Sequence, residues 1–215
     1  MVRQARSEAT RRKIIDSAVD LINGIGYPAS GLADIIERAE LTKGAFYYHF
    51  ESKEDLATAI IEEGATTVLD AFRGASRSTS PAMANIVYGL FTVTEVVDTD
   101  RIAQAACRLL RTFGGFNPAA KQTYLNLLAE MTERVRISIT DGDVRSDVDP
   151  DVASTTIVGA MLGAELLSSA VSDGADLRPR LTSTLEMLLP VIVRGESLNY
   201  YRELLAQSSV GHASG

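Results

Sequence analysis

The stretch that decides the fold is residues 32–50, LADIIERAELTKGAFYYHF. Its first half repeats apolar residues at the spacing of one helix face. These residues are Leu32, Ile35, Ile36 and Ala39. The apolar rhythm breaks at Glu40, and Thr42 supplies a hydroxyl that can cap a second helix beginning at Lys43. The stretch therefore predicts two short helices joined by a tight turn.

The second of these helices has an unusual outward face. It can bury only Ala45, Phe46 and Phe50 against the first helix. Lys43 at the helix start and the adjacent rings of Tyr47 and Tyr48 are therefore left in water, which is unfavourable for both. DNA accommodates such a face, because lysine neutralises phosphate and tyrosine or histidine donates hydrogen bonds to the backbone. The pattern predicts a helix-turn-helix motif over residues 31–50, although packing of the aromatic side chains on a neighbouring helix is the alternative.

The flanking sequence fits the same interpretation. An apolar stripe upstream predicts a helix from about Glu8 that ends at a glycine-containing turn. Downstream, residues 52–55 match an S-x-x-D capping signal for a long helix, with Lys53 in its first turn. Residues 1–13 hold five Lys/Arg against Glu8, which suits a flexible basic arm on DNA.

Residues 8 to about 68 resemble the N-terminal DNA-binding domain of the tetracycline-repressor (TetR) family of bacterial transcription regulators, and the resemblance is carried by residues 26–56, GYPASGLADIIERAELTKGAFYYHFESKEDL. Two positions depart from the family pattern: Gly31 stands where a second Ser/Thr is common, and Glu40 replaces the usual turn Gly or Asn. The opening RQARSEATRRKIIDSAV, with TKGAFYYHF and SKEDLA, is similar to the γ-butyrolactone autoregulator receptors of actinobacteria. The expected DNA contacts are Arg3, Arg6, Ser30, Lys43, Gly44, Ala45, Tyr47, Tyr48, His49 and Lys53.

Length and composition indicate a two-part, all-α protein. A chain of 215 residues with 46% hydrophobic residues can form a three-helix DNA-binding domain, expected at residues 8–68, and a larger helical domain, expected at residues 69–207. The single cysteine cannot form an intrachain disulfide, and neither a signal peptide nor a membrane span is recognisable. We therefore expect a cytoplasmic protein that associates with the nucleoid through DNA.

The net charge of −7 is distributed unevenly along the chain. Residues 1–50 carry seven Lys/Arg and six Asp/Glu, whereas residues 51–215 carry fourteen and twenty-two. The acidity therefore lies in the second domain, and a small basic patch in the first can still serve DNA binding.

The C-terminal helices predict self-association. Residues 152–170 are apolar or small on nearly every side, so another backbone can approach closely, and a leucine stripe follows at residues 181–193. The two helices can pair with the same two of a second chain as a four-helix interface, as the family resemblance also implies. The alternative is that both line a monomer core. The expected dimer contacts are Gly159, Gly163, Leu167, Leu181, Leu185 and Leu188.

The middle helices are the candidate walls of a small-molecule site, because they combine apolar side chains with a few polar groups. The expected lining is Tyr88, Phe91, Thr92, Glu95, Tyr124, Leu127, Leu128, Met131, Met161 and Glu165. Each of these residues could equally belong to plain core. The γ-butyrolactone receptors place a tryptophan in the pocket, and this chain has none, with Tyr124 and Leu127 nearest the corresponding stretch.

Three classes of function compete: a ligand-released DNA-binding repressor, an enzyme, and a regulator without a small-molecule ligand. Only two histidines occur, and the sequence shows no catalytic dyad, metal-ligand cluster or phosphate-binding glycine loop, so we expect neither catalysis nor a cofactor. The favoured function is a homodimeric repressor on a palindromic double-stranded operator, released by a small-molecule inducer. The alternative is a regulator of the same fold with no ligand or with a broad-specificity pocket.

Overall fold

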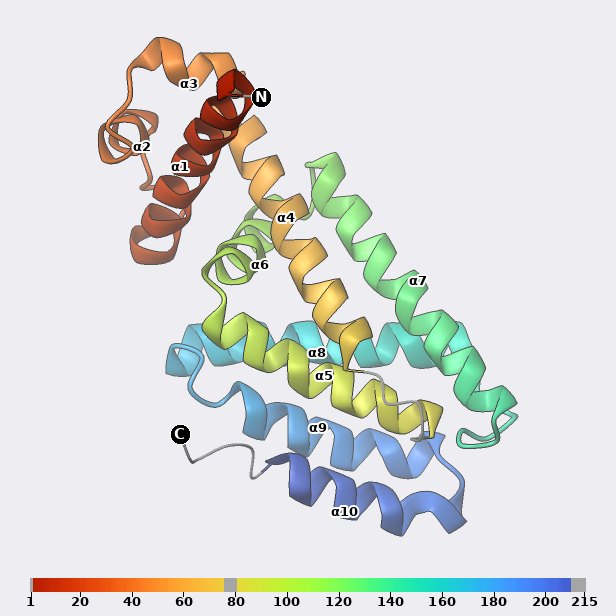
Figure 1. Cartoon of the computed structure of the whole chain (residues 1–215). Helices are drawn as coiled ribbons and strands as arrows, with labels where there is room; N and C mark the ends of the chain where they lie inside the picture. The colour runs from red at the N-terminus through yellow and green to blue at the C-terminus, as the bar shows by residue number, and fades with distance from the viewer. Residues whose placement is uncertain (1, 76–80, 210–215) are drawn as a thin grey trace. The chain divides into compact units, whose positions relative to one another are not determined.

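The computed structural model describes residues 2–75 and 81–209, with side chains described for residues 4–75 and 81–208. Helices make up nearly all of it (Figure 1), which confirms the all-α prediction. The helices are α1 (Val2–Ile25), α2 (Leu32–Arg38), α3 (Lys43–His49), α4 (Lys53–Gly74), α5 (Ala82–Thr99), α6 (Arg101–Phe113), α7 (Pro118–Thr140), α8 (Pro150–Ser172), α9 (Leu177–Ile192), the short η1 (Gly195–Ser197) and α10 (Leu198–Ser209). Within the described residues the extended backbone pairs at one isolated bridge, Val144 with Val193.

The chain divides into two compact units. The first contains the chain up to Val68 together with Thr99–Tyr124, and the second contains Leu69–Asp98 and the chain from Leu125 onward. Helices α4 and α7 therefore contribute residues to both units. Helix periodicity did not indicate that α6 groups with the N-terminal helices. The roles expected for residues 8–68 and 69–207 stay predictions.

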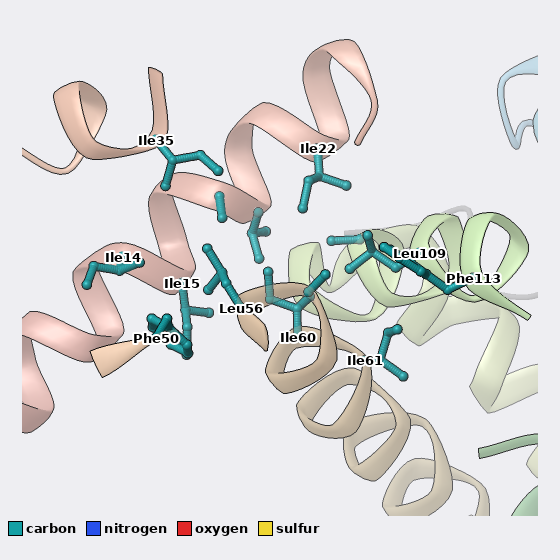
Figure 2. Close-up of a cluster of buried hydrophobic side chains, with 14 of the residues drawn as sticks. Ile14, Ile15, Ile22, Ile35, Phe50, Leu56, Ile60, Ile61, Leu109 and Phe113 are labelled. Carbon is teal, nitrogen blue, oxygen red and sulfur yellow. The ribbon is translucent and has the colours of Figure 1, made fainter. Parts of the chain in front are cut away.

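The first unit is built around one apolar cluster (Figure 2). Side chains from α1, α2, α4 and α6 point into it, among them Ile15, Ile35, Ile60 and Leu109. The three-helix core expected from the sequence is thus enlarged by α4 and α6. Helix α1 begins at Val2, so the basic segment expected to be a flexible arm is helical.

The helix-turn-helix forms where the sequence predicts it. Thr42 accepts a hydrogen bond from the Ala45 N–H at 3.2 Å, which caps α3 at the predicted start, Lys43. Phe46 and Phe50 are buried beneath the helix and fix which face of α3 points outward. The position of these two rings therefore decides the orientation of the recognition helix.

The turn between α2 and α3 contains a strained residue. Glu40 has φ 51°, in the left-handed region where glycine is favoured. Its carboxylate lies 2.7 Å from Lys13 Nζ, and this pair lowers the pKa of Glu40. Both side chains are exposed, so the ion pair offsets little of the backbone strain.

We expect Glu40→Gly to be more stable than Glu40→Ala by about 1 kcal/mol, because alanine keeps the left-handed strain and glycine removes it. Both variants lose the Lys13 pair, so that contribution cancels in the comparison. Urea denaturation of the two full-length variants measures the difference. Equal stabilities would show that the turn is unstrained.

Helix α6 crosses α4 very closely. A Cβ added at Gly64 would overlap the Cβ of Ala106 and lie 2.8 Å from the carbonyl oxygen of Ile102. Glycine at this position is required by the approach of α6, because no rotamer moves a Cβ. The crossing explains why α6 belongs to the first unit.

In the second unit α9 packs between α8 and α10. Asp149 caps α8 through the N–H groups of Asp151 and Val152, and Pro150 occupies the first helical position, as predicted. Within the described residues, α8 is the helix whose length and apolar composition match a membrane span. That match is weak evidence, because core helices of soluble proteins pass the same test.

Candidate nucleic-acid interface

The outward face of α3 presents the predicted aromatic surface. Tyr47 and Tyr48 are 47% and 72% exposed, although both are large rings. Lys43 and Gly44 are exposed beside them, and the Lys43 ammonium lies 5.8 Å from the centre of the Tyr47 ring. The arrangement combines a phosphate-binding cation, a narrow glycine position and two hydroxyl donors on one helix. This face has the chemistry of a major-groove reader.

Ala45 and His49 lie at the margin of this face and are half-buried. Burial, and to a smaller extent the charge of Arg11, lowers the pKa of His49 below its ordinary value. The free protein therefore holds His49 largely neutral at pH 7, when it can still donate one hydrogen bond.

Arg11 is a further candidate DNA contact that was not predicted from the sequence. Its guanidinium lies 5.2 Å above the centre of the Phe50 ring, and it is exposed on α1 beside the end of α3. The basic segment of residues 1–13 was the available signal, but only the packing of α1 on α3 selects Arg11 from it. Arg6 is also exposed on α1, while the side chain of Arg3 lies outside the described residues.

Two of the expected DNA contacts face the protein instead. Ser30 is fully buried, and its hydroxyl donates to the Gly26 carbonyl at 2.7 Å, so it is not available to a phosphate. The Lys53 ammonium donates to the Tyr27 carbonyl at 2.7 Å and lies 3.9 Å from the centre of that ring. Burial lowers the pKa of Lys53. Lys53 is thus held by Tyr27 in this structure.

Residues 14–60 match the sequence model of the family described as "Bacterial regulatory proteins, tetR family". The A-factor receptor protein of Streptomyces griseus is 33% identical over 195 residues, which cover 89% of this chain and 67% of that protein. The chain belongs to the TetR family. It is a transcription regulator of that family.

Solved structures agree with this assignment along the whole chain. A γ-butyrolactone receptor described as ArpA-like superposes with a TM-score of 0.78 at 25% identity, covering 96% of this chain and all of that one. The TetR-family protein CprB from Streptomyces coelicolor, solved in complex with its biological operator sequence, superposes with a TM-score of 0.75 at 26% identity, with the same coverage. The matched relatives are regulators, and none of the three is described as an enzyme.

The residues expected to line a ligand site in this TetR-family regulator are divided between the two units. Tyr124 belongs to the first unit and the other nine to the second. Phe91 and Met131 are buried and Glu95 is exposed, whereas the remaining members are half-buried. The Phe91 ring has the guanidinium of Arg178 5.1 Å from its centre. The ligand site stays a prediction. Among the described residues, no group of His, Cys, Asp or Glu could hold a metal ion.

The expected dimer contacts differ in burial, and Leu188 is half-buried. Leu181 and Leu185 are fully buried inside the chain, so they belong to its own core and are not available to a second copy. Gly159 and Leu167 are exposed, and a Cβ added at Gly163 would meet nothing within 4 Å. Further exposed apolar residues on α8 and α9 extend this surface, which we call the α8/α9 face. They are Val152, Leu162, Leu166, Val171, Met187 and Val191.

Proposed function

We propose that this protein is a homodimeric repressor that inserts α3 of each subunit into the major groove of a palindromic operator. The observation that carries the proposal is the exposed surface of Lys43, Tyr47 and Tyr48 on a helix whose opposite side is locked into the core by Phe46 and Phe50. A surface of this kind costs free energy in water unless a partner covers it. The operator complex of CprB supports duplex DNA as that partner.

Dimerisation is the second part of the proposal. The α8/α9 face exposes large apolar side chains on two helices that pack together, and a two-fold axis would pair it with the same face of another copy. Two reading helices on one palindrome also supply the specificity that a single helix rarely gives. We assign DNA reading to residues 8–68 and dimerisation with ligand binding to residues 69–207, and we place the protein in the cytoplasm at its DNA.

Selection of bound duplexes from a random library by the full-length protein tests operator binding. We expect the recovered sequences to share a palindrome whose half-sites lie about one helical turn apart. Recovery of sequences with no common motif, at an affinity equal to that for competitor DNA, would contradict sequence-specific binding. Mapping of bound DNA in the source genome would then name the regulated genes.

A small-molecule inducer is the third part. The names of the A-factor receptor and of the ArpA-like receptor support a ligand of the γ-butyrolactone kind or a related signal. The ligand would release DNA by favouring a state in which the two reading helices no longer match one DNA turn. The alternative, a regulator of the same fold with no ligand or with a broad-specificity pocket, keeps the exposed α3 face and lacks this response. The function requires no catalytic step and no cofactor.

We expect simple γ-butyrolactones to release the operator weakly or not at all. The chain contains no tryptophan, and neither Tyr124 nor Leu127 supplies the ring area of an indole. Titration of a γ-butyrolactone panel against the protein–operator complex, followed by fluorescence anisotropy, measures the release. Release at nanomolar concentrations would show that this pocket recognises the lactones without an indole ring.

A further inference from the structure

In the first unit, two guanidinium groups from two helices meet at a single carboxylate on a third. Arg38, the last residue of α2, donates to Asp20 Oδ2 through Nη2 at 2.8 Å and Nε at 3.3 Å. Arg101, the first residue of α6, pairs through Nη2 with the other oxygen, Oδ1. The Asp20 side chain, on α1, is 31% exposed, less than either guanidinium. The Asp20 carboxylate thus links α2, the helix that precedes the recognition helix α3, to the first residue of α6.

The groove around this carboxylate makes the connection sensitive to its charge. The groove has a volume of about 620 Å³ and is lined by four cations and two carboxylates. Two of these cations have partners of their own, because Arg12 pairs with Glu63 and Lys13 pairs with Glu40. Asp20 is therefore the acid that separates Arg38 from Arg101. Without its charge the two guanidinium groups would repel each other across the groove.

The first turn of α6 is anchored to α1 at the same place. The Asn23 side-chain amide donates to the Arg101 carbonyl at 2.8 Å. Asp100 Oδ1 caps the turn by accepting from the N–H groups of Ile102 and Ala103, both at 2.9 Å. A well-capped, anchored turn transmits a displacement of Arg101 to the rest of α6.

We infer that Asp20 is a positioning residue that ties the orientation of α2 to the first turn of α6. Operator binding at α3 then orders α6, and by linkage the position of α6 affects operator affinity by the same factor. The inference rests on the operator binding proposed above. It assigns a role to an acidic residue on α1 that is not part of the recognition face proposed on α3.

Amide hydrogen exchange on the full-length protein, with and without a palindromic duplex selected by the wild type, tests the connection. In the wild type we expect the duplex to slow exchange at residues 103–106 about fivefold. In Asp20→Asn we expect the DNA-dependent slowing to be lost and operator affinity to fall by about the same factor. A purely structural role would instead speed α6 exchange equally with and without DNA.

Asp16→Asn is the matched control. Asp16 lies one turn earlier on α1 in the same groove, and the charge change is identical, but Asp16 forms only a long ion pair, 3.9 Å from Arg12. The Asp16→Asn variant should therefore keep the DNA-dependent slowing of amide exchange in α6. In an Arg101→Gln background, Asp20→Asn should cause no further change in the DNA-dependent amide exchange of α6.

Equal DNA-dependent protection of α6 in the wild type and Asp20→Asn would overturn the inference, as would equal loss in the Asp16→Asn control. Failure of the wild type to select any palindromic duplex is a separate result. It would contradict the proposed operator binding itself.

Discussion

Replacing Gly163 with leucine is expected to give a folded protein that no longer dimerises and that binds its operator about 100-fold more weakly or worse. The single chain has room for the new side chain, because a Cβ at Gly163 meets nothing within 4 Å. In the proposed dimer the same position approaches a partner helix across the α8/α9 face. Overpacking costs about 1–3 kcal/mol at each site, and two-fold symmetry applies that cost twice.

Gly24→Leu is the control for the Gly163→Leu variant. Gly24 is also a helical glycine with open space around its Cβ position, and it lies on α1, outside the α8/α9 face. Sedimentation equilibrium should find this control dimeric and Gly163→Leu monomeric, with matching far-ultraviolet circular dichroism. A dimeric Gly163→Leu protein with wild-type operator affinity would remove the α8/α9 face as the dimer surface.

The helix-turn-helix could be predicted from sequence because its determinants are local. The 3.6-residue period places Ile35 and Phe46 on inward faces, and a hydroxyl at Thr42 ends one segment and starts the next. These signals act over fewer than ten residues. These local signals correctly predicted that α3 starts at Lys43 and which of its side chains face outward.

Contacts between distant segments could not be predicted, because a helical stripe does not name its partner. The stripe containing Leu181 and Leu185 is apolar whether it faces its own core or a second chain, and only the packing of α8 and α10 on α9 shows that it is internal. Side-chain direction in a loop is equally hidden. The hydroxyl of Ser30 turns inward to Gly26, although the sequence around it fits a phosphate contact.

The partner of a charged side chain cannot be predicted from neighbouring residues for the same reason. Lys53 stands at a helix start, where a cation suggests a phosphate partner, yet the Tyr27 carbonyl and ring hold its ammonium. The Tyr27 ring in turn packs in an edge-to-face arrangement with Phe113 of α6, with ring centres 4.8 Å apart. The partner of Lys53 is thus fixed by residues 26 and 60 positions away in the chain.

Lys43→Ala is expected to weaken operator binding about tenfold at physiological salt, without loss of fold or of dimerisation. Each dimer loses two phosphate contacts, so the slope of log K against log salt should flatten by about two units. The free protein should be unchanged or slightly stabilised, since Lys43 is exposed and its cation is unfavourable at the start of α3. Tyr47→Ala should reduce affinity comparably, with a smaller change in slope, because it removes no charge.

Lys121→Ala separates a specific contact from a general charge effect. Lys121 is exposed on α7 and carries the same charge, so its loss lowers the net charge of the protein equally. Because salt screens exposed charges beyond about 8–10 Å, a lysine that touches no phosphate should leave the slope unchanged. If Lys43→Ala and Lys121→Ala gave the same affinity and the same slope across the salt series, α3 would not be the element that meets the DNA backbone.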